Sequence, residues 1–333
     1  MTTSFAVIGA GAMGRNHARV LQSMGGVSLE AIVDPSVELA AEVARLHGGR
    51  TFASLDAMLA AGAPTAAVVA VPTQAHFATA RTLLEHGVHV LVEKPIATTE
   101  EEGLALARLA AEKGLVLAVG HVERFNPAVL ALKAQLDRGA LGRVFQVRAQ
   151  RIGPFPARIR DVGVALDLAT HDLDVMRYLL GADVVRVFAE AKREVHTSND
   201  DLVSALLRFA DDTVGTLEVN WLTPTKSREL TVTGERGMFR VDYLTQDLFF
   251  FENAAAPIAA SWPAMSVLRG VSEGTMTRYP IPKKEPLRAE LEGFVRAIGG
   301  DRSQIVSGED GVRALRVATA LGESSRTRAV VTP

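Results

Sequence analysis

A glycine-rich motif near the start of the chain restricts the folds that this sequence can adopt. The apolar run Phe5–Ile8 ends at Gly9, and Gly9-Ala-Gly11-Ala-Met-Gly14 leads into a segment with helical spacing. Between a strand and a helix, the first glycine permits a tight turn, the second lets the backbone approach a pyrophosphate, and the third lets the helix pack on the strand. The motif predicts a dinucleotide-binding site made by Gly9, Gly11, Ala12, Met13 and Gly14.

An acidic residue follows the next apolar run. Residues 29–33 are mostly apolar and lead to Asp34, twenty positions after Gly14. A carboxylate at this place hydrogen-bonds the ribose hydroxyls of NAD and repels the 2′-phosphate of NADP, so we expect NAD as the cofactor rather than NADP. The alternative is that Asp34 caps the helix that begins after Pro35.

Apolar runs and helical segments continue to alternate up to residue 119. We expect helices at 36–47, 74–87 and 100–113, and strands at 66–71, 89–92 and 115–119. This order predicts an α/β fold with a doubly wound parallel sheet, in which ligands bind beyond the carboxyl ends of the strands. Pro72 and Thr73 follow one strand, and Glu93-Lys94-Pro95 follows the next. Packing gives no reason to end a buried strand in an acid, a base and an imino acid, so we assign both segments to the cofactor site.

The second half of the chain has the alternating pattern of half-exposed strands. We expect strands at 144–152, 184–192, 202–209, 214–221, 228–233 and 237–243. They predict an α+β domain with an open, mostly antiparallel sheet. Residues 254–285 are aperiodic and are interpreted as a loop, and helices are expected at 286–298 and 311–323. The last helix is expected to pack on the first domain.

One expected helix, at 164–180, carries charged residues although most of its sides are apolar. Asp167, His171 and Asp174 fall on one stripe of this helix. Burying such groups is costly unless they pair or perform chemistry. They form either an internally satisfied pair or the wall of an active site. Three ligands from one helix make an incomplete metal site, so we expect no metal.

The bulk properties exclude several kinds of protein. The 333 residues exceed what one core usually holds, so we expect two domains, at 1–122 and 123–333. A net charge of −2 does not favour binding to nucleic acid or to a membrane surface. The sequence has no cysteine and no apolar run long enough to span a membrane, and its first residues do not read as a signal peptide. We therefore expect a cytoplasmic protein.

Taken together, these motifs resemble the glucose–fructose oxidoreductase / inositol dehydrogenase / MocA (Gfo/Idh/MocA) family of sugar oxidoreductases. The resemblance extends over the whole chain and rests on the glycine motif, Glu93-Lys94-Pro95, the segment 124–127, Asp167-x-x-x-His171 and the tail from Ser307. It implies that Lys94, Asp167 and His171 meet around the nicotinamide as the catalytic group. It also implies that Glu93 lies near the nicotinamide carboxamide or ribose, and that the peptide bond before Pro95 is often cis.

Further residues are assigned from the resemblance or from their place in the chain. His121 and Arg124 either cap or salt-bridge their loop or contact the ligands; the family position of Arg124 implies a substrate or cofactor contact, and His121 is expected to contact the substrate. His76 is expected to lie on the adenine side of the cofactor or to cap its helix. His17 is expected to be structural. Arg148, Arg151, Arg158 and Arg160 either clamp a diphosphate or form a basic sheet face or a subunit contact. Arg148 and Gln150 share a strand face while Arg151 points the other way, so not all four arginines can reach one ligand from a regular strand. Arg148 is expected to bind the substrate.

Two longer stretches, 120–129 and 220–234, resemble enzymes that oxidise the 3-hydroxyl of UDP-N-acetylglucosamine. The substrate is therefore expected to be a sugar or a nucleotide sugar. The alternatives are a free-polyol or inositol-type dehydrogenase and a non-catalytic NAD(H)-binding regulator. The open sheet, with the apolar run 248–251 nearby, is expected to mediate a homodimer or homotetramer.

Overall fold

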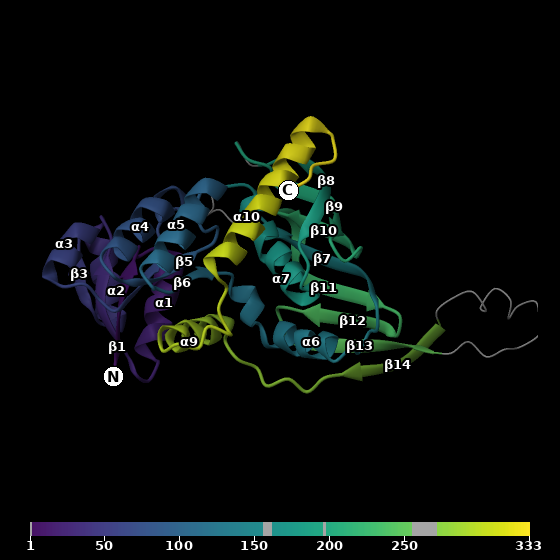
Figure 1. Cartoon of the computed structure of the whole chain (residues 1–333), viewed down its shortest axis with the longest axis horizontal. Coiled ribbons are helices and arrows are strands. Elements are labelled where there is room, and N and C mark those ends of the chain that lie inside the picture. Colours follow the sequence, from purple (N-terminus) through teal and green to yellow (C-terminus); the bar gives the residue numbers. More distant parts are fainter. Residues whose placement is uncertain (1, 156–161, 196–197, 255–271) are drawn as a thin grey trace, which may run out of the picture. The chain divides into compact units, whose positions relative to one another are not determined.

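A computed structural model describes residues 2–155, 162–195, 198–254 and 272–333 of the chain (Figure 1). The chain divides into two compact units. The first comprises Met1–Phe125 and Glu285–Arg316, and the second comprises Asn126–Lys284 and Val317–Pro333. The expected fold class, a parallel Rossmann sheet followed by a mostly antiparallel sheet, is confirmed.

The first unit is built on a six-stranded parallel sheet in the order β3-β2-β1-β4-β5-β6. Its strands are β1 (Thr3–Ile8), β2 (Val27–Val33), β3 (Arg50–Phe52), β4 (Ala66–Val69), β5 (His89–Glu93) and β6 (Leu117–Gly120). All four residues of β4 and of β6 are buried, as expected for central strands covered on both faces. The order reverses beside β1, so β1 and β4 flank the switch point at which such sheets bind their ligands.

Helices pack on this sheet. They are α1 (Ala12–Gln22), α2 (Val37–His47), α3 (Leu55–Ala61), α4 (His76–Glu85), α5 (Glu100–Glu112) and α9 (Pro286–Ile298), with short 3₁₀ turns η1 (Thr73–Ala75) and η2 (Val122–Phe125). Ser36, Ser54 and Thr99 cap α2, α3 and α5 through their hydroxyls. The late segment α9 joins this core, where the ring of Phe294 meets that of Phe5 edge-on at 6.0 Å between centroids.

The second unit contains an eight-stranded sheet in the order β14-β13-β12-β11-β7-β10-β9-β8. Its strands are β7 (Val144–Pro154), β8 (Val184–Lys192), β9 (Leu202–Phe209), β10 (Val214–Asn220), β11 (Leu222–Gly234), β12 (Gly237–Asp242), β13 (Asp247–Ala254) and β14 (Ser272–Arg278). Neighbours are antiparallel except β7 and β10, which run parallel. Alternate residues of β7, such as Val147 and Ala149, are buried in a core shared with α7 (Thr170–Leu180).

Three further helical segments complete the description. These are α6 (Pro127–Asp137), a π-helical turn η3 (Ala165–Ala169) directly before α7, and α10 (Gly308–Thr327). The first part of α10, up to Arg316, belongs to the first unit and the remainder to the second. In the second unit, Ser324 accepts a hydrogen bond from the backbone N–H of Ala189 in β8, which fixes the end of α10 on the sheet.

Four sequence-based assignments need correction. The loop expected at 254–285 contains β14, which pairs with β13. The run 248–251 is not one exposed patch but lies within β13, where Leu248 is fully buried and Phe250 packs on Phe239 at 4.7 Å between ring centroids. Helix α6 was not among the expected elements; it begins at Asn126-Pro127, where Asn126 accepts the N–H of Ala128 and Pro127 occupies the first turn. Finally, β3 and α3 had no counterpart among the expected elements.

Candidate active site

The glycine loop of the first unit has the geometry that its motif predicts. Gly9 has φ +98°, and a Cβ there would lie 2.5 Å from the carbonyl oxygen of Ala70. A Cβ on Gly14 would lie 1.8 Å from the carbonyl oxygen of Gly9, so helix α1 can approach the loop only with glycine at this position. In contrast, a Cβ on Gly11 would meet nothing within 4 Å. Protein packing requires two of the glycines, whereas the third borders open space at a helix N-terminus, as a pyrophosphate site does.

Asp34 is attached to this loop. One carboxylate oxygen accepts the N–H of Ala10 at 2.7 Å, and the other accepts the N–H of Ser36 at 2.8 Å. Asp34 does not cap α2, because the hydroxyl of Ser36 fills that role. The carboxylate is therefore held at the carboxyl end of β2 beside the glycine motif, and its half-exposed side chain is placed as a ribose ligand would be.

Glu93, the acid that ends β5, is buried and paired. The imidazole of His17, in α1, donates from Nε2 to a Glu93 oxygen at 2.7 Å, and His17 is fully buried. Burial alone would raise the pKa of Glu93, but the hydrogen bond from His17 and the charges of His17, Lys94 and His76 outweigh it, so this pKa lies below its usual range. Gly120 makes room for this carboxylate, since a Cβ there would lie 3.1 Å from it.

His76 is placed between two loops at the same sheet edge. Its Nδ1 lies 2.7 Å from the carbonyl oxygen of Pro95, and its Nε2 lies 2.9 Å from that of Val71. The residue is 1% exposed. Burial lowers the pKa of His76, and the two carbonyls and Glu93 partly counteract that lowering. His76 begins α4 without capping it. Both of its ring nitrogens lie within hydrogen-bond distance of main-chain carbonyl oxygens.

Lys94 is half-exposed at the carboxyl end of β5. The Lys94–Pro95 peptide bond is cis, as the family resemblance implies. Pro95, Ile96 and Ala97 are buried directly after it, so the backbone on which Lys94 stands is packed into the first unit while its side chain retains access to solvent.

The two residues expected to contact substrate after β6 are both buried. Arg124 donates to Asp310 of α10 at 2.9 Å, and its side chain is 10% exposed. His121 is 1% exposed. The ion pair fastens the turn η2 to the start of α10 within the first unit, so Arg124 has at least a structural role.

In the second unit, the helix with the unusual charges is irregular. Asp167 lies within the π-helical turn η3, and His171 lies in the first turn of α7. Both are half-exposed, whereas Asp174 is completely buried. Single π turns are frequent at functional sites. Asp167 in the π turn and His171 just after it are accessible, whereas Asp174, further along α7, is buried.

A buried ion pair holds this helix on the sheet. Arg151 of β7 donates from Nε and Nη2 to the two oxygens of Asp172, at 2.7 and 3.1 Å. The side chains are 2% and 0% exposed. The guanidinium also lies over the ring of Tyr243, 5.1 Å from its centroid. Because Asp172 adjoins His171, this pair fixes the rotation of α7 about its axis.

Arg148 is not brought together with Asp167 and His171. It projects from the opposite face of β7 and lines a hollow of about 570 Å³ with Glu190, Leu206 and Glu218. The expectation that Arg148 contacts the same substrate is therefore withdrawn. Arg151 is occupied by Asp172, and Arg158 and Arg160 lie outside the described residues.

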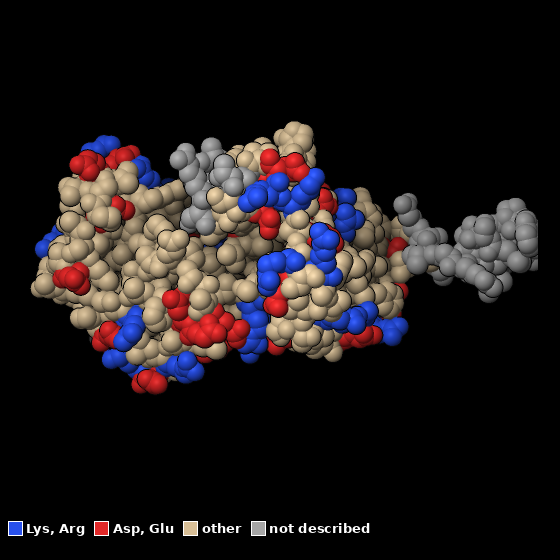
Figure 2. Space-filling model, turned by 90° about the horizontal axis from the view of Figure 1, so that it is seen from above, with Lys and Arg blue, Asp and Glu red and all other residues tan. Residues whose placement is uncertain are grey.

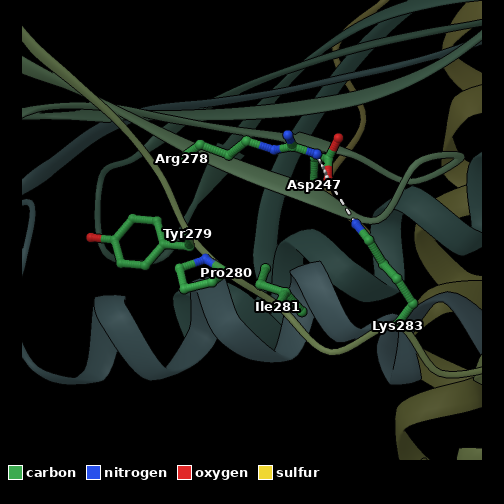
Figure 3. A pocket seen from close by; sticks show the side chains of 6 residues that line it. All are labelled: Asp247, Arg278, Tyr279, Pro280, Ile281 and Lys283. Carbon is green, nitrogen blue, oxygen red and sulfur yellow. Dashed lines mark hydrogen bonds and ion pairs between the residues drawn. The ribbon is translucent and has the colours of Figure 1, made fainter.

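Another pocket of the second unit, of about 300 Å³, is shown in Figure 3. Arg278 and Lys283 both reach Asp247, at 3.0 and 2.7 Å, from opposite sides. Their hydrogen bonds, that of Lys283 first, hold the pKa of Asp247 well below its usual range. The cations are thus already engaged, and none of the expected site residues line this pocket.

The surface, the side-chain clusters and the helices each add one observation. Basic and acidic side chains stand side by side in several places on the face shown in Figure 2, in keeping with the small net charge. Within the part of the chain that the structure describes, no three His, Cys, Asp or Glu side chains are grouped to hold a metal ion. Among the same residues, no helix has both the length and the apolar character needed to cross a membrane.

Comparison with known proteins identifies the class. Residues 3–121 match the oxidoreductase family with an NAD-binding Rossmann fold, and residues 129–240 match the GFO/IDH/MocA C-terminal domain. The protein is therefore an NAD-binding oxidoreductase. It belongs to the Gfo/Idh/MocA family, as its motifs implied.

Individual relatives cover nearly the whole chain. The UDP-N-acetylglucosamine 3-dehydrogenase of Acidithiobacillus ferrooxidans is 33% identical over 312 residues, which cover 94% of each chain. A solved structure of that enzyme has a TM-score of 0.85 at 31% identity and covers 98% of both chains. The myo-inositol dehydrogenase Hyg17 of Streptomyces leeuwenhoekii is 35% identical over 242 residues, 70% of this chain and 74% of that one.

Proposed function

We propose that this protein oxidises the 3-hydroxyl of UDP-N-acetylglucosamine to a ketone with NAD as the oxidant. The observation that carries the proposal is full-length similarity to an enzyme of that name, in both sequence and structure. The stretches 120–129 and 220–234 led to the same substrate class from the sequence.

The first unit offers a site that fits the cofactor. The open space beside Gly11 at the N-terminus of α1 suits a pyrophosphate, and the carboxylate of Asp34 suits the adenosine ribose. We propose Pro72 and Thr73 as further cofactor contacts, because they follow β4 at the same sheet edge. Bound NAD would supply the acceptor for the hydride that leaves the sugar carbon.

We assign the proton chemistry to Lys94, Asp167 and His171. The hydroxyl proton has to leave as the C–H bond breaks, and a neutral imidazole can accept it, which favours His171 as the base. The ammonium of Lys94 would hold the substrate oxygen and stabilise the negative charge that develops on it. The carboxylate of Asp167 would orient one of the two. This assignment rests on the family resemblance, and the half-exposure of all three side chains is compatible with it.

A panel of substrates tests the proposal. NAD reduction, followed by nicotinamide absorbance, is measured with UDP-N-acetylglucosamine, free N-acetylglucosamine, glucose and myo-inositol. Reduction with the UDP-sugar alone supports the proposal. Reduction with myo-inositol alone favours the second candidate function, an inositol-type dehydrogenase, which the 35% identity to Hyg17 supports.

A lysine substitution separates an enzyme from a regulator. Lys94→Met should reduce the hydride-transfer rate at least about a hundredfold while NADH still binds, since its charge acts on the transition state. The matched control is Lys113→Met, an exposed lysine at the end of α5, which should behave as the unsubstituted protein. Full activity of Lys94→Met would contradict the catalytic assignment.

We also propose a cytoplasmic homodimer or homotetramer that assembles through the open face of the second sheet. Leu206 and Phe145 are 55% and 43% exposed, and Leu206 lines the hollow that contains Arg148. Exposed apolar side chains of this size favour association. Light scattering on Leu206→Glu tests this arrangement, which predicts dissociation to smaller species. An unchanged mass would contradict it.

A further inference from the structure

His76 connects two chain segments that the parallel sheet no longer holds together. The ladder between β4 and β5 ends at the pair Val69–Val92. Beyond it, the chain continues into Val71 on one side and into Lys94–Pro95 on the other. The imidazole lies between them, 2.9 Å from the carbonyl oxygen of Val71 and 2.7 Å from that of Pro95. It therefore replaces the ladder where the strands have ended.

We propose that His76 is a positioning residue for hydride transfer. By lying between the carbonyls of Val71 and Pro95, within hydrogen-bond distance of both, it fixes the backbone that carries Lys94 and the loop that leads to Thr73. The inference deepens the proposed function and rests on the role given there to Lys94. His76 itself is 1% exposed, so its effect is transmitted through the backbone.

The chemistry of the ring explains why histidine suits this place. A carbonyl oxygen only accepts hydrogen bonds, so each ring nitrogen that bonds to one has to carry a hydrogen. A neutral imidazole satisfies one of the two carbonyls and an imidazolium satisfies both. The charged groups that bear on the ring are Glu93, which favours the imidazolium, and Lys94, which opposes it. Phenylalanine has a similar shape but no donor, and glutamine keeps a donor on a flexible chain.

Two variants and a control test the inference. His76→Phe should lower kcat for UDP-N-acetylglucosamine by about a hundredfold, the cost of a misplaced catalytic group. The Kd for NADH should rise by less than about tenfold, well below the fall in kcat, because Pro72 and Thr73 are only two of the proposed cofactor contacts. His76→Gln should recover part of kcat. His89→Phe, which removes a histidine hydrogen bond to Val116 at the opposite end of β5, should leave kcat unchanged.

Hydrogen exchange gives a readout that needs no substrate. In His76→Phe, amide exchange should become faster in residues 70–75 and 94–98 and stay the same in 115–120. A purely structural role would instead lower the melting temperature and speed exchange throughout the first unit, with kcat of the folded fraction unchanged. That result, or kcat and exchange equal to those of the unsubstituted protein in both His76 variants, would overturn the inference.

Measurements on Lys94→Met separate a failure of the proposed function and its catalytic assignment from a failure of the positioning role of His76. If the unsubstituted protein does not reduce NAD with UDP-N-acetylglucosamine, the proposed function fails. If it does and Lys94→Met retains turnover, the catalytic role of Lys94 fails and the positioning role fails with it. If Lys94→Met is inactive while both His76 variants have normal kcat, the positioning role fails alone.

Discussion

The Nε2 atom of His17 lies 2.7 Å from a carboxylate oxygen of Glu93, and both residues are buried. His17 stands on α1, one turn after the glycine motif, and Glu93 is the last residue of β5. The pair thus joins the helix that faces the expected pyrophosphate to the turn that carries Lys94. This contact explains why a buried strand ends in an acid, since a carboxylate can be buried there only with its partner in place.

The pair makes stability depend on pH in a defined direction. The pKa of Glu93 is lower in the folded protein than its ordinary value, because His17 donates a hydrogen bond to the carboxylate. The unfolded chain therefore takes up the proton first as the pH falls. The stabilising contribution is complete above the unfolded pKa and is lost as the pH falls through the lower, folded pKa.

Glu93→Gln removes this charge with little change of shape. It should reduce the free energy of unfolding at neutral pH by about 2 kcal/mol, as for the loss of a hydrogen bond to a charged group. The difference from the unsubstituted protein should shrink below pH 4.5. Urea unfolding over a pH series measures both quantities, with the exposed Glu112→Gln as control. A difference that stays constant with pH would refute the linkage.

Two glycines of the same motif should respond differently to alanine. Gly14→Ala places a Cβ 1.8 Å from the Gly9 carbonyl oxygen, so it should destabilise the protein by about 3 kcal/mol or more. Gly11→Ala meets no neighbour within 4 Å. It should change stability by less than about 0.5 kcal/mol but weaken NADH binding about tenfold, or about 1.4 kcal/mol. Calorimetry and NADH titration measure both, and normal NADH binding by Gly11→Ala would remove Gly11 from the cofactor site.

Asp34→Asn tests the basis of cofactor choice. Loss of a charged acceptor for the ribose hydroxyls should raise the Kd for NADH about tenfold. The preference for NADH over NADPH should decline, because the negative charge that repels a 2′-phosphate is gone. Fluorescence titration with both cofactors measures the ratio. An unchanged ratio would mean that the bond from Ala10 to Asp34 serves the loop alone.

The buried pair of Arg151 and Asp172 can be tested by a double-mutant cycle. Arg151→Met and Asp172→Leu should each cost about 3–5 kcal/mol, because each leaves a buried charge without its partner. The double variant should cost less than the sum by about 2 kcal/mol or more. If the loss of unfolding free energy in the double variant equals the sum of the two single losses, the two residues do not act as a pair.

Local patterns predicted the fold class because strands and helices in this chain have distinct periods. The continuous apolar run of β4 and the alternation in β7 each identify their sheet. Strand β14 has no periodic pattern of apolar residues, so its sequence did not indicate a strand. It is recognised only by its pairing with β13. Helix α6 was missed because Asn126-Pro127 resembles a turn, although the same two residues are a regular helix start.

For the site, sequence identifies residue types but not which partner each one meets. The catalytic role of Lys94, Asp167 and His171 remains a prediction from the resemblance. The folded structure was needed to find that His17 pairs with Glu93 and Arg151 with Asp172. In each pair the two residues are far apart in the sequence and belong to different elements. A signal existed for His17: it lies three residues after Gly14 on the buried side of α1, and a buried imidazole requires a hydrogen-bond partner.

Transfer of deuterium from the sugar to NAD tests the central claim most directly. UDP-N-acetylglucosamine carrying deuterium at C3 is mixed with the protein and NAD, and the reduced cofactor is analysed by mass spectrometry and NMR. The account predicts one deuterium on the nicotinamide C4, a slower rate than with unlabelled substrate, and no transfer by Lys94→Met. Reduced cofactor without deuterium, or reduction with myo-inositol but not with the UDP-sugar, would contradict it.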